Sequence, residues 1–423
     1  MMTQTLRPTT LVWLLAVAGS LCWIRPATSA EVDTSTLRGK VMCGYQGWFN
    51  CEGDGAGLAW THWARGRGRL PGPGNITVDL WPDMKEYGAA ERYATDFKNA
   101  DGSPAEVFSS HNRQTVLRHF DWMREYGIDG AFVQRFANGL RGGRMLRHKD
   151  VVLGHCREGA KSAGRAYAVM YDLSGIRRGG TAVVREDWAR LRGESKITAD
   201  AAYLKHEGKP LVAVWGIGFG DGRDYSLDEC QELVEFLKSD GCAVMLGVPT
   251  GWRRGERDAV KDPQLKQIIA LADVVSPWTI GRYRSPEQAA RHGEKVLKPD
   301  LAWCRERDID FLPVVFPGFS WSNLKGGQEQ LGAIPRLKGR FLWSQFVAAK
   351  RAGCEMIYVA MFDEVDEGTA IFKCSDNPPN SGKTKFLTLE GLPSDYYLRL
   401  TGAGARLLRG ELPMGEAVPD LRN

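Results

Sequence analysis

The stretch MIYVAMFDEVDEGTAIF, residues 356–372, joins an apolar strand to a cluster of acidic side chains. The segment Met356–Phe362 is too apolar for a surface position, and Gly368 interrupts the pattern after it. Like charges this close together raise one another's pKa, so such a cluster either has a chemical task or is neutralised by arginines or solvent. Four carboxyl groups therefore follow the end of a buried strand, namely Asp363, Glu364, Asp366 and Glu367.

Seven further apolar runs have the same β-rich composition and, like this one, lack strict polar alternation. This composition is typical of strands that are buried on both faces. The runs are Val41–Phe49, Asp129–Phe136, Ala166–Leu173, Pro210–Phe219, Ala243–Val248, Asp273–Ile280 and Asp310–Phe316. Helical patterns separate many of them, at Arg113–Tyr126, Ser226–Ser239, Pro286–Glu306 and Gly339–Ala352, and a last one follows at Tyr396–Leu408.

Repeated alternation of strands and helices predicts an α/β fold, a (β/α)8 TIM barrel. An open doubly wound sheet is the alternative, but no Gly-x-Gly-x-x-Gly follows an early strand. With 423 residues, 43% hydrophobic and 25% charged, the chain has ample material for one large domain. We expect this (β/α)8 domain at residues 31–410 and a tail at residues 411–423.

A long insertion separates the first strand from its helix at residues 50–110. Loops of this length are usually functional or disordered. Here Trp60, His62, Trp63 and Trp81 favour an ordered loop. We therefore expect the insertion to cover the active-site end of the barrel.

The first 30 residues have the pattern of a signal peptide. Arg7 precedes the short apolar segment Leu11–Leu21, and small residues lead to Ala30 before Glu31. The apolar segment is too short for a comfortable membrane span. We expect a secreted or periplasmic protein, cleaved near Ala30, with no stable membrane insertion. The sequence does not indicate an oligomeric state.

Charge and cysteine content exclude some classes of function. The formal net charge of +5 is spread along the chain, which gives no footprint for nucleic acid. Neither C-x-x-C nor H-x-x-x-H spacing occurs, so we expect no metal site and no cofactor. Export permits disulfides, and Cys43 and Cys51 are close enough in the chain to close a small loop. Cys354 and Cys374 are a second possible pair.

The residues at the strand ends indicate a carbohydrate site, because active sites of (β/α)8 enzymes lie at the carboxyl ends of the strands. Tryptophan faces stack on sugar rings, and polar groups bind the hydroxyls. A single tryptophan is more often a core residue, but here several strand ends carry one. The candidate substrate-binding residues are Tyr45, Gln46, Trp48, His62, Gln134, Arg135, Asp172, Trp215, Trp252, Trp278, Trp321, Asp363 and Asp366.

Glu364 and Glu367 are the candidate catalytic pair. Three residues apart, they would share a face of a helical turn with about 5–6 Å between Cβ atoms. Glycoside cleavage needs one protonated and one ionised carboxyl group, and a close pair favours retention of configuration. The neighbouring charges raise the pKa of Glu367, which favours it as the acid/base.

The segment FDEVDEGTAI, residues 362–371, resembles the Asn-Glu-Trp-His-Glu-Gly-Thr-Gln-Ile motif of glycoside hydrolase family 99, the endo-α-mannosidases and endo-α-mannanases. Residues 119–130 and 203–212 resemble two further passages of that family, and the similarity extends loosely from Val41 to Thr369. The resemblance implies a (β/α)8 fold and retaining hydrolysis of an α-linked sugar in an oligo- or polysaccharide substrate.

By motif position, the resemblance also implies roles for the two glutamates. Glu364 would engage the sugar 2-hydroxyl, which attacks C1 to give a 1,2-anhydro sugar, and Glu367 would be the general acid/base. The chain departs from the motif at Asp363, Val365 and Asp366, which replace Asn, Trp and His. It therefore resembles a divergent 71/99-like relative, and mannose specificity does not follow.

Two other functions remain open from the sequence. One is a carbohydrate-binding barrel without catalysis, which would keep the tryptophans but not a working acid pair. The other is a metal-dependent enzyme on the same fold, in which the carboxylates would hold a hard cation such as Ca²⁺ or Mg²⁺.

Overall fold

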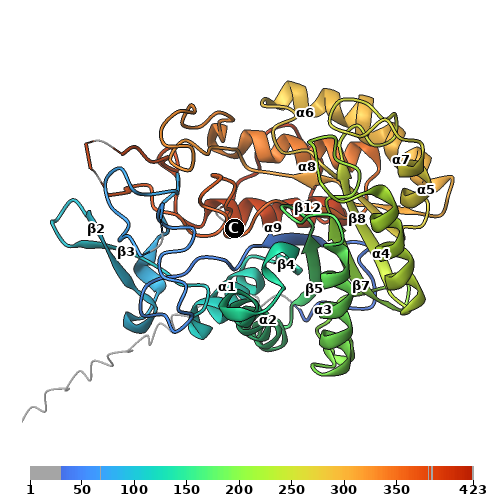
Figure 1. The fold of residues 1–423 in the computed structure, drawn as a ribbon. Coiled ribbons are helices and arrows are strands. Elements are labelled where there is room, and N and C mark those ends of the chain that lie inside the picture. Colours follow the sequence, from blue (N-terminus) through green and yellow to red (C-terminus); the bar gives the residue numbers. More distant parts are fainter. Residues whose placement is uncertain (1–29, 67, 380, 383, 422–423) are drawn as a thin grey trace, which may run out of the picture.

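A curled parallel sheet with helices on its outside forms the body of the protein (Figure 1). The computed structural model describes residues 30–421 except residues 67, 380 and 383. The strands of the sheet are β1 (Val41–Tyr45), β4 (Gly130–Phe136), β5 (Ala166–Asp172), β7 (Lys209–Trp215), β8 (Ala243–Pro249), β9 (Val274–Trp278), β10 (Asp310–Phe311), β11 (Val314–Val315) and β12 (Ile357–Val359). The order is β10-β9-β8-β7-β5-β4-β1-β12-β11, and β6 (Lys205–His206) pairs antiparallel with β7.

Two short strands, β10 and β11, connect the two ends of this sheet. They are consecutive pieces of one apolar run, and β10 pairs with β9 whereas β11 pairs with β12. Between them, Leu312 N–H donates to Val275 O at 2.9 Å, and Tyr358 N–H donates to Pro313 O at 3.0 Å. Counting this run once, the predicted strands occupy successive positions around the sheet, which confirms the TIM-barrel-like α/β fold.

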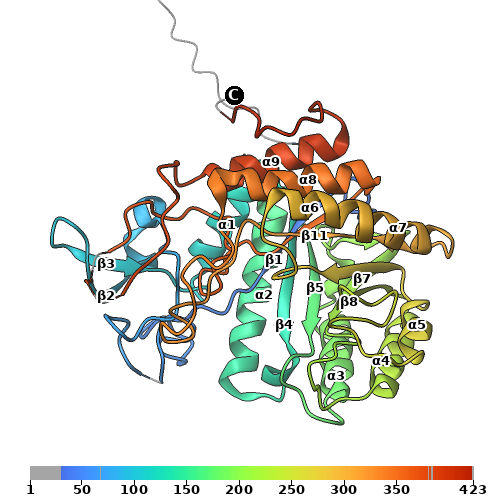
Figure 2. The ribbon, with the colours of Figure 1, turned by 90° about the horizontal axis from the view of Figure 1, so that it is seen from above.

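The helices alternate with the strands and lie outside the sheet (Figure 2). Ser226 begins α4 by accepting from Glu229 N–H, and the left-handed Gly164 ends α2. A π-helical turn, Gly293–Leu297, joins α6 to α7. The helices are α1 (Arg113–Glu125), α2 (Gly143–Ala163), α3 (Thr181–Gly193), α4 (Leu227–Ser239), α5 (Gln264–Ile269), α6 (Pro286–His292), α7 (Lys298–Arg305), α8 (Arg340–Ala352) and α9 (Tyr396–Arg409). Short 3₁₀ turns lie at Met84–Glu86, Ala89–Glu91, Ala137–Gly139, Ile197–Ala199 and Leu337–Gly339.

Successive side chains of each strand face alternately the barrel interior and the helices. In the interior, Gln134 Nε2 of β4 donates to Tyr358 Oη of β12 at 3.0 Å and contacts Met170 Sδ of β5. The next residue on β4, Arg135, faces outward and pairs with Asp187 of α3. This alternation decides which residues near the strand ends reach the site.

The insertion after β1 has two parts. Strands β2 (Tyr93–Lys98) and β3 (Pro104–Val107) form an antiparallel hairpin that lies to one side of the barrel (left in Figures 1 and 2). The part before the hairpin contacts the loop after β12, because Asp79 N–H and Leu80 N–H both donate to Val365 O, at 3.0 and 3.2 Å.

Asp79 also fixes the insertion to the loop after β11. Its carboxylate accepts from Ser320 Oγ at 2.5 Å, Ser322 N–H at 2.6 Å and Asn323 N–H at 2.8 Å. Both loops at this end of the barrel therefore depend on one fully buried aspartate.

The predicted Cys43–Cys51 disulfide is wrong. All eight cysteines of the described residues are buried free thiols, including Cys354 and Cys374. Cys43 lies within β1, whereas Cys51 lies in the insertion and donates to Phe108 O at 3.2 Å. The sequence distance permitted the bridge, but the two thiols pack in different surroundings.

Among the described residues, none of the helices combines the length and apolarity that crossing a membrane requires. The predicted signal peptide lies, except for Ala30, outside the described residues.

Candidate active site

The acid loop, residues 360–370, follows β12 at the carboxyl end of the sheet. Its ends are held together, because Met361 N–H donates to Thr369 O at 3.3 Å and Ile371 N–H donates to Met361 O at 3.1 Å. Gly368 has a φ of 63°, and a Cβ there would lie 3.0 Å from Ser320. This close approach to the loop after β11 requires glycine.

Asp363 anchors the acid loop to the end of β1. Its two carboxylate oxygens accept the backbone N–H groups of Gln46 at 2.8 Å and Gly47 at 2.9 Å. Burial raises the pKa of Asp363 to about 7, and the two backbone hydrogen bonds oppose this shift. Because its carboxylate is fully buried and engaged, Asp363 is a structural residue, not the sugar ligand that we expected from the sequence.

The carboxylate of Glu364 accepts a hydrogen bond on each oxygen. Gln46 Nε2 donates to Oε1 at 2.5 Å, and Thr369 Oγ1 donates to Oε2 at 2.6 Å. Burial, together with the charges of Glu367 and Asp366, raises the pKa of Glu364 well above its usual value, and the two donors act in the opposite direction.

Glu367 has a different environment. Its side chain is half-buried, and no group of the described residues donates a hydrogen bond to its carboxylate. Burial raises the pKa of Glu367 to about 7, and the charges of Asp366 and Asp172 contribute, whereas Lys325 lowers it. Two neighbouring acids of the same loop therefore differ in their hydrogen-bond donors.

His62 of the insertion reaches the acid loop. Its Nδ1 lies 2.9 Å from Asp366 Oδ2. The imidazole stacks on Trp48, with ring centroids 3.9 Å apart and an interplanar angle of 5°. Among the described residues, Asp366 Oδ1 has no partner. His62, Trp48 and Asp366 thus form one contiguous group beside Glu367.

Gln134, Asp172, Trp215 and Trp278 lie on the interior side of their strands. Asp172 and Trp215 are paired in register on β5 and β7. The ring centroids of Trp215 and Trp278 are 5.4 Å apart, and Trp278 lies 6.3 Å from the interior Tyr358. The structure therefore brings these four predicted residues together inside the barrel, at the carboxyl end of the strands. We call this part of the barrel interior the interior opening.

Three other predicted residues face away from the site, which corrects their assignment. Tyr45 is fully buried, with its hydroxyl 2.9 Å from His119 Nδ1 of α1. Arg135 NH2 lies 2.6 Å from Asp187 Oδ1 in the helical layer. Trp252 packs edge-on against Trp303 of α7. Tyr45 and Arg135 occupy outward positions of their strands, and Trp252 lies in a loop that packs on a helix.

Trp321 lies in the loop after β11. It is half-buried, and Lys325 Nζ is 4.7 Å from its ring centroid. Because the charge of Lys325 also reaches Glu367, this loop borders the acid pair.

A cavity of about 660 Å³ opens beside the acid loop. Its walls come from the β1 end, the insertion, the loops after β4 and β5, and the start of α2. The lining residues are Trp48, Thr61, His62, Phe136, Asn138, Gly139, Arg141, Gly142, Met145, Lys149, Ser174 and Gly175.

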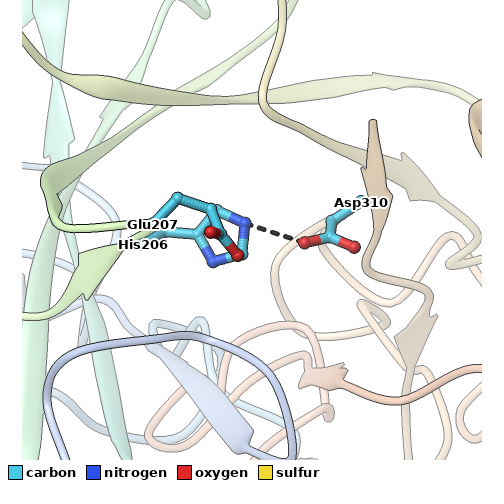
Figure 3. A group of neighbouring side chains, drawn as sticks. All are labelled: His206, Glu207 and Asp310. Carbon is cyan, nitrogen blue, oxygen red and sulfur yellow. Dashed lines mark ion pairs between the residues drawn. The ribbon is translucent and has the colours of Figure 1, made fainter. Parts of the chain in front are cut away.

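A second polar cluster lies at the opposite, amino-terminal end of the strands, where Figure 3 shows His206, Glu207 and Asp310. His206 Nε2 is 2.8 Å from Asp310 Oδ2. Arg38 lies 2.6 Å from Glu207 and 3.0 Å from Asp310, so its guanidinium supplies the positive charge between the two acids. We therefore interpret this cluster as an ion-pair network.

Comparison with known proteins finds structures with a similar barrel. No protein-family model and no curated protein matches the chain. The structure of a family 99 endo-α-mannosidase from Bacteroides thetaiotaomicron has a TM-score of 0.64 at 16% identity, covering 89% of this chain and 99% of that one. The barrel is similar to that of glycoside hydrolase family 99. The same enzyme in complex with bis-tris propane gives a TM-score of 0.63 at 15% identity over the same shares.

A further structure, described as a glycoside hydrolase-like protein, has a TM-score of 0.51 at 12% identity and covers 81% of this chain and 98% of that one. The expected resemblance to a family 99 barrel is thus confirmed in the fold, and at these identities the likeness concerns the fold alone.

Sequence reasoning missed several residues of this family 99-like barrel. Thr369 lies only two residues after the last acid, so the sequence alone could have indicated its contact with Glu364. Asp79 and Lys149 gave no signal, because the first lies in an irregular insertion and the second on a helix.

Proposed function

We propose that this protein is a glycoside hydrolase that cleaves an α-linked glycan with retention of configuration. The observation that carries the proposal is the contrast between Glu364 and Glu367 at the carboxyl end of a family 99-like barrel. One carboxyl group accepts two hydrogen bonds, and the other has none from the described residues. A fold shared with an endo-α-mannosidase supports the reaction class.

The hydrogen bonds favour different protonation states in the two acids. Donors to both oxygens of Glu364 stabilise its ionised form. Burial raises the pKa of both groups, but only Glu364 has donors that oppose the shift, and we assign the proton that the pair retains near neutral pH to Glu367 on this contrast in hydrogen bonding. Glu367 is therefore the general acid/base, and Glu364 is the carboxylate that polarises the 2-hydroxyl.

In the first step, the 2-hydroxyl gives its proton to Glu364 and its oxygen attacks C1, while Glu367 protonates the leaving oxygen. This forms a 1,2-anhydro sugar and breaks the glycosidic bond. In the second step, water attacks C1 and gives a proton to Glu367, and Glu364 returns its proton to the 2-oxygen. Two inversions at C1 produce net retention.

The interior opening supplies surfaces for the sugar. Trp215 and Trp278 are half-buried and offer apolar faces for stacking on the sugar ring. Gln134 and Asp172 offer polar groups for its hydroxyls. Trp48 and His62 extend this surface toward the cavity. We propose secretion as well, with cleavage near Ala30, and amino-terminal sequencing of exported protein tests that point.

Product analysis on purified protein tests the reaction. Residues 31–423 are incubated with α-linked manno-oligosaccharides, in which the 2-hydroxyl is trans to the leaving oxygen as attack on C1 requires, and NMR follows the first anomer released. We expect the α-anomer first. The Glu367→Gln variant should lose turnover and keep binding, whereas Glu329→Gln, an exposed glutamate of the neighbouring loop, should match the parent. Release of the β-anomer first, or normal turnover by Glu367→Gln, would contradict the proposal.

A further inference from the structure

The cavity beside the acid loop carries positive charge without negative charge. Arg141 and Lys149 are among its lining residues, and none of the described residues that line it is an aspartate or glutamate. The adjacent catalytic groups, in contrast, are carboxyls. The cavity therefore differs in charge from the acid loop that it borders.

Lys149 is a half-buried cation without an ion pair among the described residues, and the carboxylates of Asp172 and Asp187 act on it only from a longer distance. It lies on α2 with its Nζ 5.4 Å from the Phe136 ring centroid. Within the described residues it forms no hydrogen bond or ion pair. Burial lowers the pKa of Lys149 to about 8. A poorly solvated ammonium without a partner is unfavourable, and an anion in the cavity would remove that cost.

None of the acidic residues near Lys149 forms an ion pair with it among the described residues. Asp150, the next residue on α2, is bound by Arg135 at 3.0 Å and by Arg190 at 2.8 Å. The charge of Lys149 lowers the pKa of Asp172, but the two side chains do not form an ion pair. Arg141 is exposed and has no ion pair among the described residues. Two cations at this cavity therefore remain available to a ligand.

The cavity is continuous with the candidate active site. Trp48 and His62 form part of its wall, and His62 contacts Asp366, the residue before Glu367. A volume of about 660 Å³ is large enough for a sugar unit. A glycan bound at the acid pair therefore has room to place a neighbouring unit against Lys149.

We propose that this cavity binds an anionic group of the glycan, a carboxylate or a sulfate ester, and that the substrate is an acidic α-linked polysaccharide. This inference rests on the proposed function for its link to hydrolysis. A neutral sugar would leave the charges of Arg141 and Lys149 without an ionic partner in the cavity. An acidic unit compensates them with charge-assisted hydrogen bonds.

Calorimetric titration with a matched pair of ligands tests the proposal. Trigalacturonate and its trimethyl ester have the same α-linked backbone, but only the first is charged. Maltotriose with and without sulfate esters forms the second pair and distinguishes sulfate from carboxylate. The Glu367→Gln protein is used to prevent turnover. We expect at least one charged ligand to bind about tenfold more tightly than its neutral partner, as one charge-assisted contact allows.

Two variants test whether Lys149 and Arg141 produce the preference for the charged ligand. Lys149→Gln and Arg141→Gln should each reduce the preference for the charged ligand several-fold, and the double variant should remove it, with binding of the neutral ligand unchanged. Lys161→Gln, an exposed position of the same helix, is the control. Arg141 is exposed, so its variant tests the idea even if Lys149→Gln fails to fold. Equal binding of charged and neutral ligands in both pairs, or a preference that survives the double variant, would overturn the proposal.

The outcomes separate this inference from the proposed function, because binding is measured without turnover. A protein that prefers the charged ligand but hydrolyses no glycan supports the anionic site and overturns the hydrolase. A protein that hydrolyses neutral glycans without any charge preference overturns the anionic site alone.

Discussion

The side-chain amide of Gln46 donates to Glu364 Oε1 at 2.5 Å across a separation of 318 residues in the chain. With Thr369 on the other oxygen, this contact fixes the orientation of the carboxylate and opposes the rise of its pKa on burial. Gln46 is therefore a positioning residue for the candidate catalytic pair.

We expect Gln46→Leu to reduce kcat about 10- to 100-fold, the cost of losing one hydrogen bond to a charged group. The donor lowers the pKa of Glu364, so its removal raises that pKa. The acidic limb of the pH–rate profile should then move to higher pH. A lower kcat with an unchanged acidic limb would show that Gln46 acts by packing alone.

Two substitutions should shift the basic limb of the profile in opposite directions. Asp172 raises and Lys325 lowers the pKa of Glu367, which is about 7. Activity needs protonated Glu367, so it falls as pH rises through this pKa. Asp172→Asn should move the basic limb to lower pH, and Lys325→Gln should move it to higher pH. Shifts of the same sign would exclude Glu367 as the acid.

The effect of Glu367→Gln should depend on the leaving group. An oligosaccharide leaving group needs protonation, so its release should slow at least about 100-fold. A dinitrophenolate leaves without a proton, so the first step on that substrate should be much less affected. Single-turnover kinetics on both substrates measure the difference, and equal losses would assign Glu367 another role.

Arg135→Gln should destabilise the protein and leave substrate binding unchanged. The side chain is 1% exposed and pairs with Asp187, and breaking a buried ion pair costs about 3–5 kcal/mol. Arg113→Gln is the control, because the Arg113–Glu158 pair is about half exposed and should contribute little. Urea denaturation measures both. A raised KM with normal stability would return Arg135 to the binding site.

Asp79→Ala should loosen both loops at the active-site end. It removes an acceptor of three hydrogen bonds, and we expect a loss of about 2 kcal/mol or more in the free energy of unfolding. Limited proteolysis should then cut within residues 50–110 faster than in the parent. Exposed Asp101→Ala, in the tip of the same insertion, should not change the rate.

The sequence was sufficient for the strands and for the acid loop, because apolar runs and charge clusters are local patterns. It was not sufficient for the direction of side chains at the strand ends. Gln134 and Arg135 are neighbours on one strand, so only one of the two side chains faces the interior. A run with strict alternation of polar and apolar residues would have shown which one, but this run lacks it. Lys149 and Asp79 depend on contacts between distant segments, and no local pattern marks such contacts.

The parts of the candidate site come from opposite ends of the chain. Gln46 and Asp363 are in contact but 317 residues apart, and β12 completes the sheet only between β1 and β11. At bacterial or eukaryotic rates of synthesis, roughly 15–60 s separate these two residues on the ribosome. The acids therefore acquire their hydrogen-bond partners only when the polypeptide is almost finished, and a nascent chain that lacks β12 has no assembled candidate site.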